Sequence, residues 1–293
     1  MKYLPLQSII QLLCTVNLSF FESVRLRSQI LNKNNLVSRL TASNSLIQNT
    51  SLNSTFTTTT LSFLYQNVRG LNSKFDSFSN NLLSCVDEVD VLILTETWLH
   101  EDVANSELFP DNYCIFRCDR KYKHLGVVRG GGVLIAINNK FSCCTVDVSN
   151  ITNAIPSIDF VGIEIFLSNY LHFFIFTVYI PPSVSITDYV DFFDLVSSLD
   201  QIHNNLVLFV GDFNTPKFGS ELNNNFSHCL NNFVSFCGFC QYNHILNNYD
   251  SLLDLIFSTF PCTVLRSDFF LVPEVIEFFI RSILQKFHLQ IYM

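Results

Sequence analysis

The sequence predicts an α/β fold in which two β-sheets pack face to face and helices cover their outer surfaces. Short apolar runs, each the length of a buried strand, alternate with segments whose apolar residues recur at helical spacing. In the middle of the chain several strand-like runs follow one another directly, which favours two packed sheets over one doubly wound sheet. With 293 residues the chain can bury a substantial core in one or two domains.

The predicted strands begin after a change in composition near residue 60. Residues 1–60 are rich in Ser, Asn, Thr and Leu, and we interpret them as a poorly ordered leader with a helix around residues 22–31. The run at 89–96 is nearly all apolar, which predicts a strand covered on both faces. In order, strands are expected at 61–67, 89–96, 114–116, 131–137, 158–165, 171–182, 206–210 and 251–258.

Helices are expected between these strands, where apolar side chains recur every three or four residues. The segment 74–86 has this spacing, and so does the segment around 226–237. The segment 187–203 has Asp188 near its start, a favourable position for an acid, and then one apolar stripe of Tyr189, Phe192, Phe193, Val196 and Leu199.

Composition excludes several classes of protein. Charged residues make up only 14% of the chain, and 30 Phe are present, so the chain as a whole is not of the disordered class. The net charge of −8 argues against binding nucleic acid through bulk positive charge, although it allows a local basic rim. Ten Cys are too dilute for a disulfide scaffold, and we interpret them as reduced thiols of an intracellular protein, nuclear or cytoplasmic.

No segment is long and apolar enough to predict a membrane anchor. Spanning a bilayer takes roughly 18–20 consecutive apolar residues, and no run in this chain reaches that length. The N-terminal apolar stretch is interrupted by Gln7, Gln11 and Asn17, which leaves a secretory signal as the weaker alternative. We therefore expect no membrane partner.

Polar side chains stand at the ends of four predicted strands: Asn67, Glu96, Tyr179, and Asp212 with Asn214. The carboxyl ends of buried strands are where α/β folds place their ligands. If these ends converge, carboxylate and amide oxygens form a ligand set suited to Mg²⁺ or Mn²⁺, and an Asp could draw a proton from water. Each residue alone has a plainer interpretation, such as a Gly-Asp-x-Asn turn, but the joint pattern favours a site.

Short motifs that occur in order along residues 61–270 resemble those of a known family. They are NVRGL, LTETWL, RCDR, RGGGVLIAI, VYIPP, GDFN and SLLDLIF. Together they look like the endonuclease domain of non-LTR retrotransposons, particularly jockey-like elements, in the endonuclease/exonuclease/phosphatase superfamily. The resemblance implies a four-layer α/β sandwich of two packed mixed sheets flanked by helices. It also implies a magnesium-dependent nuclease whose nick in DNA primes reverse transcription.

The resemblance also assigns roles to the strand-end residues. Glu96 would be the principal metal ligand, with Asn67 in the same pocket. Asp212 would activate the attacking water, Asn214 would orient substrate or nucleophile, and Tyr179 would hydrogen-bond the phosphate. Asp254 would orient a histidine that the family places shortly after the strand holding this Asp.

That histidine has no match in this sequence. One register places Phe269 at its position, a second meets Val275 and Phe278, and no acid precedes His288. We therefore expect weak or absent nuclease activity. We also expect that the chain lacks a reverse transcriptase, that residues 271–293 form a divergent tail, and that the final strands of the domain are truncated. The alternatives are a catalytically dead nucleic-acid-binding remnant of the same fold and a relative acting on a phospholipid or inositol phosphate.

The sequence predicts DNA as a binding partner. We expect the chain to be a monomer. One basic region, with Arg117, Arg120, Lys121, Lys123 and Arg129, predicts contacts with the DNA backbone, against the plainer interpretation of a solvated loop.

Two other clusters of residues suggest sites but favour plainer interpretations. Cys237, Cys240 and His244, with His228 and Cys229 upstream, suggest zinc, but their crowding on one Phe-rich segment favours buried free thiols. A strand follows the glycines at 130–132, so they predict a tight turn and no phosphate-binding loop.

Overall fold

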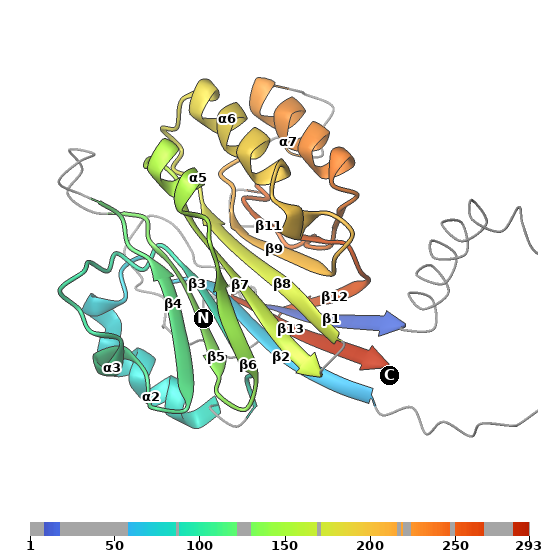
Figure 1. The fold of residues 1–293 in the computed structure, drawn as a ribbon. Coiled ribbons are helices and arrows are strands. Elements are labelled where there is room, and N and C mark those ends of the chain that lie inside the picture. Colours follow the sequence, from blue (N-terminus) through green and yellow to red (C-terminus); the bar gives the residue numbers. More distant parts are fainter. Residues whose placement is uncertain are drawn as a thin grey trace, which may run out of the picture.

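The computed structural model describes residues 9–17, 58–85, 88–121, 130–168, 171–215, 218, 224–246, 250–266 and 284–292. Two mixed β-sheets pack face to face, and helices cover the outer surface of each (Figure 1). This arrangement confirms the predicted α/β sandwich. Within the described part of the chain, no helix is long and apolar enough to cross a bilayer.

The first sheet has seven strands in the order β1-β12-β13-β2-β3-β5-β4. At its centre β2 (Thr58–Asn67) and β3 (Val91–Thr95) run parallel, so Asn67 pairs with Thr95, the residue directly before Glu96. The outer strands are β1 (Ile9–Asn17), β12 (Cys262–Arg266), β13 (Leu284–Tyr292), β5 (Val133–Asn138) and β4 (Tyr113–Cys118).

The second sheet has six strands in the order β10-β11-β9-β8-β7-β6. Here β8 (Leu171–Tyr179) and β9 (Val207–Asp212) run parallel, and β9 pairs antiparallel with β11 (Asp254–Ser258). Tyr179, Asp212 and Asp254 are consequently neighbours across three adjacent strands. The remaining strands are β10 (Cys240–Gln241), β7 (Asp159–Ser168) and β6 (Ser142–Val146).

Helices on the outer surfaces follow the predicted apolar stripes. On the first sheet the 3-10 turn η1 (Asn72–Lys74) leads into α2 (Phe75–Cys85), and α3 (Asn105–Leu108) follows β3. On the second sheet Ser185 and Asn224 cap α6 (Ile186–Ser197) and α7 (Asn225–Phe236) by accepting backbone N–H groups. The shorter helices are α5 (Ser149–Ala154) and η2 (Asp200–Ile202).

The core consists of three apolar layers. Aliphatic side chains such as Ile93, Ile135 and Ile175 fill the space between the sheets. Aromatic side chains dominate the layer beneath α6 and α7, where Phe209 lies 5.3 Å from Phe213 and 5.9 Å from Phe233 between ring centroids. A third layer lies under α2. Each fully buried side chain of this size stabilises the fold by about 1.5–3 kcal/mol, which explains the high Phe content.

The structure differs from the sequence prediction at several elements. Strand β9 continues through Gly211 to Asp212 and does not end at Val210. Gly211 is required by close packing within the sheet, because a Cβ there would lie 2.0 Å from the Val178 carbonyl oxygen. Helix α6 ends at Ser197, and 3-10 turn η2 replaces its predicted continuation. Sequence reasoning missed the short or polar elements α3, β6, α5, β10 and β12.

Strands from both ends of the chain join the first sheet. β1 lies within the predicted leader and β13 within the predicted tail, and the two pair in parallel. The helix predicted around residues 22–31 lies outside the described residues. Cys262 is disulfide-bonded, so the expectation of reduced thiols is wrong at this position. The other described cysteines with described side chains are free.

Candidate active site

Three chain segments are joined by backbone hydrogen bonds at the end of the first sheet. Gly70 N donates to Glu96 O at 2.8 Å, which ties the loop after β2 to the loop after β3. Trp98 N donates to Gly131 O at 2.9 Å, which adds the segment before β5. Glu96 and Trp98 have left-handed φ values of 52° and 54°, uncommon for residues with a side chain. Such strain persists only where surrounding contacts hold it, and it is concentrated at functional sites.

The side chains of Asn67, Glu96 and Asp212 meet at this end of the sandwich. Asn67 Nδ2 donates to Glu96 Oε1 and to Asp212 Oδ2, each at 3.0 Å. All three side chains are buried. Asn67 Oδ1 is also buried and has no hydrogen-bond partner within the described part of the protein. The amide therefore joins two carboxylates through its nitrogen and leaves its oxygen available.

Two further acidic and polar groups complete this cluster. Asp254 pairs with Asp212 in the sheet register and accepts a short hydrogen bond from the Tyr65 hydroxyl at Oδ1. Tyr65 also lies 2.9 Å from Thr95 Oγ1. Asn214, with a φ of 46°, donates its backbone N–H to Asp212 Oδ1 at 3.1 Å. Its side chain donates to Ile180 O at 2.7 Å, which fixes the loop after β9.

Burial and mutual repulsion perturb the acidic groups strongly. Burial, followed by the charges of Asp254 and Glu96, raises the pKa of Asp212 well above its usual range. Burial also raises the pKa of Asp254 to about 7, although the hydrogen bond from Tyr65 opposes the shift. Burial and the charges of Glu96 and Asp212 keep the pKa of Tyr179 raised, so its phenol stays protonated.

The residues at this cluster fit a small hard cation. Arg69 Nε lies 3.7 Å from Glu96 Oε1 and supplies part of the counter-charge. The available Asn67 oxygen and the two carboxylates it joins are the ligand types that Mg²⁺ prefers, and Mg²⁺ typically takes one or two carboxylates and keeps several waters. No group of three or more His, Cys, Asp or Glu within the described residues has the arrangement of a metal cage.

Comparison with known proteins agrees with this geometry. Residues 64–272 match the model of the Endonuclease/Exonuclease/phosphatase family. The chain belongs to this family. No curated protein sequence matches it significantly.

Solved structures share the family fold. The endonuclease domain of TRAS1, a telomere-specific non-LTR retrotransposon, is 14% identical, with a TM-score of 0.55 over 78% of this chain and 98% of that domain. The human Nocturnin catalytic domain, solved with a bound sulfate anion, is 10% identical, with a TM-score of 0.50 over 82% of this chain and 97% of that domain. At these identities the likeness shows the fold alone.

The predicted site residues divide into two groups in this family fold. The strand-end residues of the sequence prediction are neighbours, either through the hydrogen bonds above or through the sheet register: Asn67, Glu96, Tyr179, Asp212, Asn214 and Asp254. The basic residues predicted to contact DNA differ in their exposure to solvent and in their contacts within the protein. Lys121 is exposed, and Arg129 lies outside the described residues.

The two arginines before Lys121 are engaged with the protein itself. Arg117 Nη2 donates to Val103 O at 2.5 Å and lies 3.2 Å from Asp119 Oδ2. Arg120 is only 8% exposed and is ion-paired with Asp159, so its guanidinium faces the protein interior and not a solvated loop. The two positions discussed for the family histidine, Phe269 and Val275 to Phe278, lie outside the described residues.

Sequence reasoning missed several side chains at the site. Trp98 Nε1 donates to Glu96 Oε2 at 3.3 Å, and the indole ring lies against Gly70, where a Cβ would come within 2.6 Å of it. Arg69 was available as a signal, since it lies two residues after Asn67 in the same motif. The bond from Tyr65 to Asp254 joins residues 189 apart in the chain, and no local pattern announces it.

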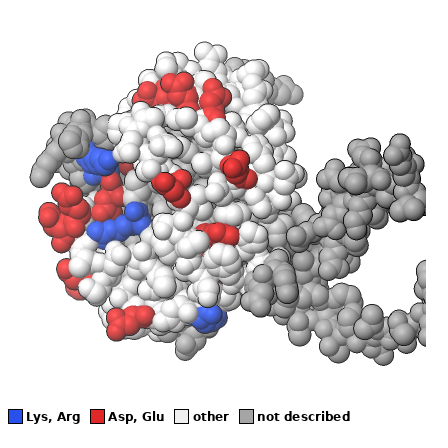
Figure 2. All heavy atoms as spheres, in the orientation of Figure 1, with Lys and Arg blue, Asp and Glu red and all other residues white. Residues whose placement is uncertain are grey.

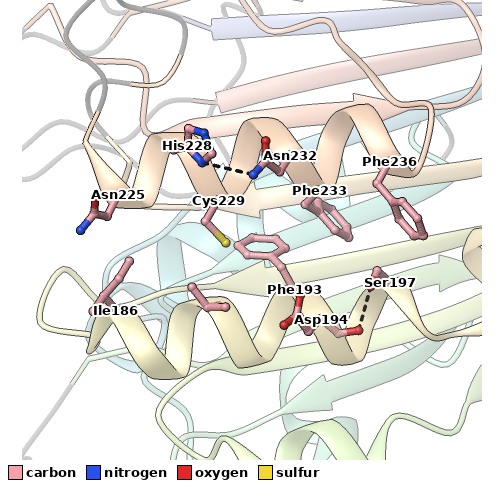
Figure 3. Close-up of a pocket in the computed structure, with 11 residues that line it drawn as sticks. Ile186, Phe193, Asp194, Ser197, Asn225, His228, Cys229, Asn232, Phe233 and Phe236 are labelled. Carbon is pink, nitrogen blue, oxygen red and sulfur yellow. Dashed lines mark hydrogen bonds between the residues drawn. The ribbon is translucent and has the colours of Figure 1, made fainter.

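The other predicted clusters lie away from the carboxylates. Cys237 and Cys240 are free thiols, and burial raises the pKa of Cys237 to about 11. Figure 3 shows a groove of about 480 Å³ between α6 and α7, lined mainly by apolar side chains such as Phe193, Phe233 and Phe236. His228 and Cys229 also line this groove, but none of the strand-end residues does, so the groove is separate from the candidate active site.

Proposed function

We propose that this chain is a magnesium-type DNA endonuclease domain derived from a non-LTR retrotransposon, with residues 61–270 as its catalytic domain. The observation that carries the proposal is the buried cluster of Asn67, Glu96 and Asp212, in which one amide nitrogen bridges two carboxylates and the amide oxygen has no described partner. Such an arrangement is unfavourable without a cation, because like charges and an unpaired polar atom are buried together.

Glu96 and the Asn67 oxygen would hold the metal ion, with Asp212 at its edge. Enzymes of this family generally depend on a divalent metal. When bound, Mg²⁺ would polarise a phosphoryl oxygen and neutralise the charge that develops on it. Mn²⁺ suits the same ligands.

The protein side chains around the ion would divide the remaining work. The raised pKa of Asp212 suits a general base that takes a proton from the attacking water. Asn214 holds Asp212 through its backbone N–H and would orient the nucleophile or substrate. The protonated phenol of Tyr179 would donate a hydrogen bond to the phosphate, and Arg69 would supply positive charge at the rim.

DNA is the proposed substrate because of the motifs NVRGL to SLLDLIF and the fold shared with a retrotransposon endonuclease domain. In Figure 2 the visible Lys and Arg lie mainly on the side of β4, whereas only acidic side chains are visible at the end that carries α6. Helices α6 and α7 contain no Lys or Arg. The proposed DNA path therefore runs over the β4 side, with Lys121 as its described exposed cation and Arg129 as a further candidate.

A second candidate is a catalytically impaired or dead remnant that still binds nucleic acid. The bond between Asp254 and Tyr65 favours this candidate, because the carboxylate expected to orient a histidine already has a phenol as partner. Losing one transition-state hydrogen-bond donor lowers kcat by roughly 10²–10³ in other enzymes, so slow turnover is the expected behaviour.

Nicking of supercoiled plasmid with Mg²⁺ tests the proposal. We expect slow nicking by the wild-type chain and a further loss of roughly 10²-fold or more in Glu96→Gln. Asp191→Asn, a substitution at an exposed acid of α6, serves as the matched control and should nick like the wild type. Nicking that survives in Glu96→Gln would contradict the metal role. Absence of nicking with retained DNA binding would favour the remnant.

A further inference from the structure

A buried ion pair lies against the ring of Tyr179. Arg120 donates to Asp159 Oδ2 through Nε at 3.0 Å and through Nη2 at 2.7 Å, and Nη2 also donates to Ser157 O at 3.1 Å. The Arg120 Cζ atom lies 5.2 Å from the centroid of the Tyr179 ring, within the range of a cation–π contact. Asp159 pairs with Tyr179 in the sheet register, so the ion pair and the phenol share one end of β7 and β8.

The glycines before β5 make room for this ion pair. A Cβ at Gly131 would lie 2.2 Å from Arg120 Nε and 2.4 Å from Asp159 Oδ2, which no side chain tolerates. The Gly132 N–H donates to the same Asp159 oxygen at 2.7 Å. The glycine run therefore serves the close approach of the guanidinium and carboxylate, a role that the sequence prediction of a tight turn did not include.

Stability alone does not explain a buried ion pair in this place. Desolvating two charges offsets most of their attraction, and apolar replacements of such pairs are often neutral or stabilising. Here the pair connects the segment after β4, the start of β5 and the start of β7, and it ends against the ring of Tyr179, whose phenol is close enough to Glu96 and Asp212 for their charges to raise its pKa. These contacts fit a pair whose role is to fix the side chain of Tyr179 in place.

We propose that the Arg120–Asp159 pair positions Tyr179 as a hydrogen-bond donor to the substrate phosphate; this inference rests on the proposed function. The guanidinium lies over the ring and fixes its position, and its charge favours polarisation of the O–H bond toward an anionic acceptor. Arg120 and Asp159 are thus positioning residues that act through Tyr179 and do not touch the substrate.

A double-mutant cycle between Arg120→Lys and Tyr179→Phe tests the inference. Lys keeps the charge but cannot reach Asp159 and Ser157 together with one planar fork. We expect Arg120→Lys and Asp159→Asn each to lower kcat roughly 10-fold while KM changes less than 3-fold. Tyr179→Phe should lower kcat roughly 10²-fold. In the Tyr179→Phe background, Arg120→Lys should cause no further loss, because its route to the substrate is gone.

The matched control is Lys140→Met, which removes an ion pair with Asp90 that lies beside Asn138, at the opposite end of β5 from Gly132. Its effect should be negligible in both backgrounds. The same cycle is measured on Mg²⁺-dependent binding of a phosphorothioate duplex, so that a chain with little turnover still gives a result. If the chain nicks or binds DNA and the losses caused by Arg120→Lys and Tyr179→Phe add in the double variant, the positioning role is overturned and the proposed function is not. A wild-type chain that neither nicks nor binds the duplex would overturn the proposed function and this inference together.

Discussion

The carboxylate end of the sandwich and the aromatic layer beneath α6 and α7 follow opposite physical rules. In the aromatic layer most buried side chains are apolar, and rings pack at centroid distances of about 5–6 Å, as for Phe209 with Phe213. At the carboxylate end Glu96, Asp212 and Asp254 are buried close together, and the backbone is left-handed at Glu96 and Asn214. The first region stabilises the fold, and the second is held in an unfavourable state by it.

The largest effect is expected in the aromatic layer. Phe209→Ala should lower the free energy of unfolding by about 3–5 kcal/mol, because it removes buried surface and leaves a cavity. Chemical denaturation measures this change. Phe236, which is 69% exposed on α7, is the matched control, and Phe236→Ala should change stability by less than about 1 kcal/mol. Equal losses at the two positions would contradict the packing account.

A substitution at the carboxylate end should have the opposite sign. Asp212→Asn removes one of the buried carboxyl groups that burial and mutual repulsion place in conflict, and it should raise the free energy of unfolding of the metal-free protein by about 1–2 kcal/mol. The same variant should lose nicking. A destabilised Asp212→Asn protein would show that the carboxylates are not in conflict without metal.

The pH dependence should separate the regions as well. Burial raises the pKa of Asp254 from 3.8 to about 7, so between these values the folded state binds more protons than the unfolded state. The free energy of unfolding of the metal-free protein should therefore fall as the pH rises through this window, by about 1 kcal/mol per pH unit. The charged side chains that interact with Asp254 are Asp212, Glu96 and Arg69. Denaturation series at several pH values should give a smaller slope in Asp254→Asn than in the wild type.

The smallest effect is expected on the outer surface. Lys121→Ala should weaken duplex binding a few-fold and reduce the slope of log affinity against log salt by about 0.9, if its side chain contacts one phosphate. Lys140→Ala, at the other end of the sheet, should leave this slope unchanged. The reverse result would move the proposed DNA path away from the β4 side.

Much of the fold could be predicted because its central strands are short apolar runs with polar residues at their ends. Asn67, Glu96 and Asp212 were found in this way, since each directly ends or follows a run that only a buried strand explains. Gly211 misled the prediction of the strand end, because its need for Gly comes from the Val178 carbonyl on the neighbouring strand. Polar strands such as β6 carry too few apolar residues to show alternation.

The parts of the site that could not be predicted depend on contacts distant in sequence. Arg120 reads as a solvated basic residue until Asp159, 39 residues later, is placed beside it. Tyr65 reads as one more core aromatic until Asp254 arrives from the other sheet. In both cases a charged or polar group is satisfied by a partner that only the tertiary fold supplies.

The most direct test of the account is a titration of the metal site itself. Trp98 is the chain's single Trp, and its Nε1 donates to Glu96, so its fluorescence reports on this carboxylate. Addition of Mn²⁺ should quench Trp98 saturably in the wild type, excess Mg²⁺ should reverse the quenching, and Glu96→Gln should abolish it. Quenching of equal strength in Glu96→Gln, or no saturable quenching in a folded wild-type chain, would contradict the claim that these side chains hold a divalent cation.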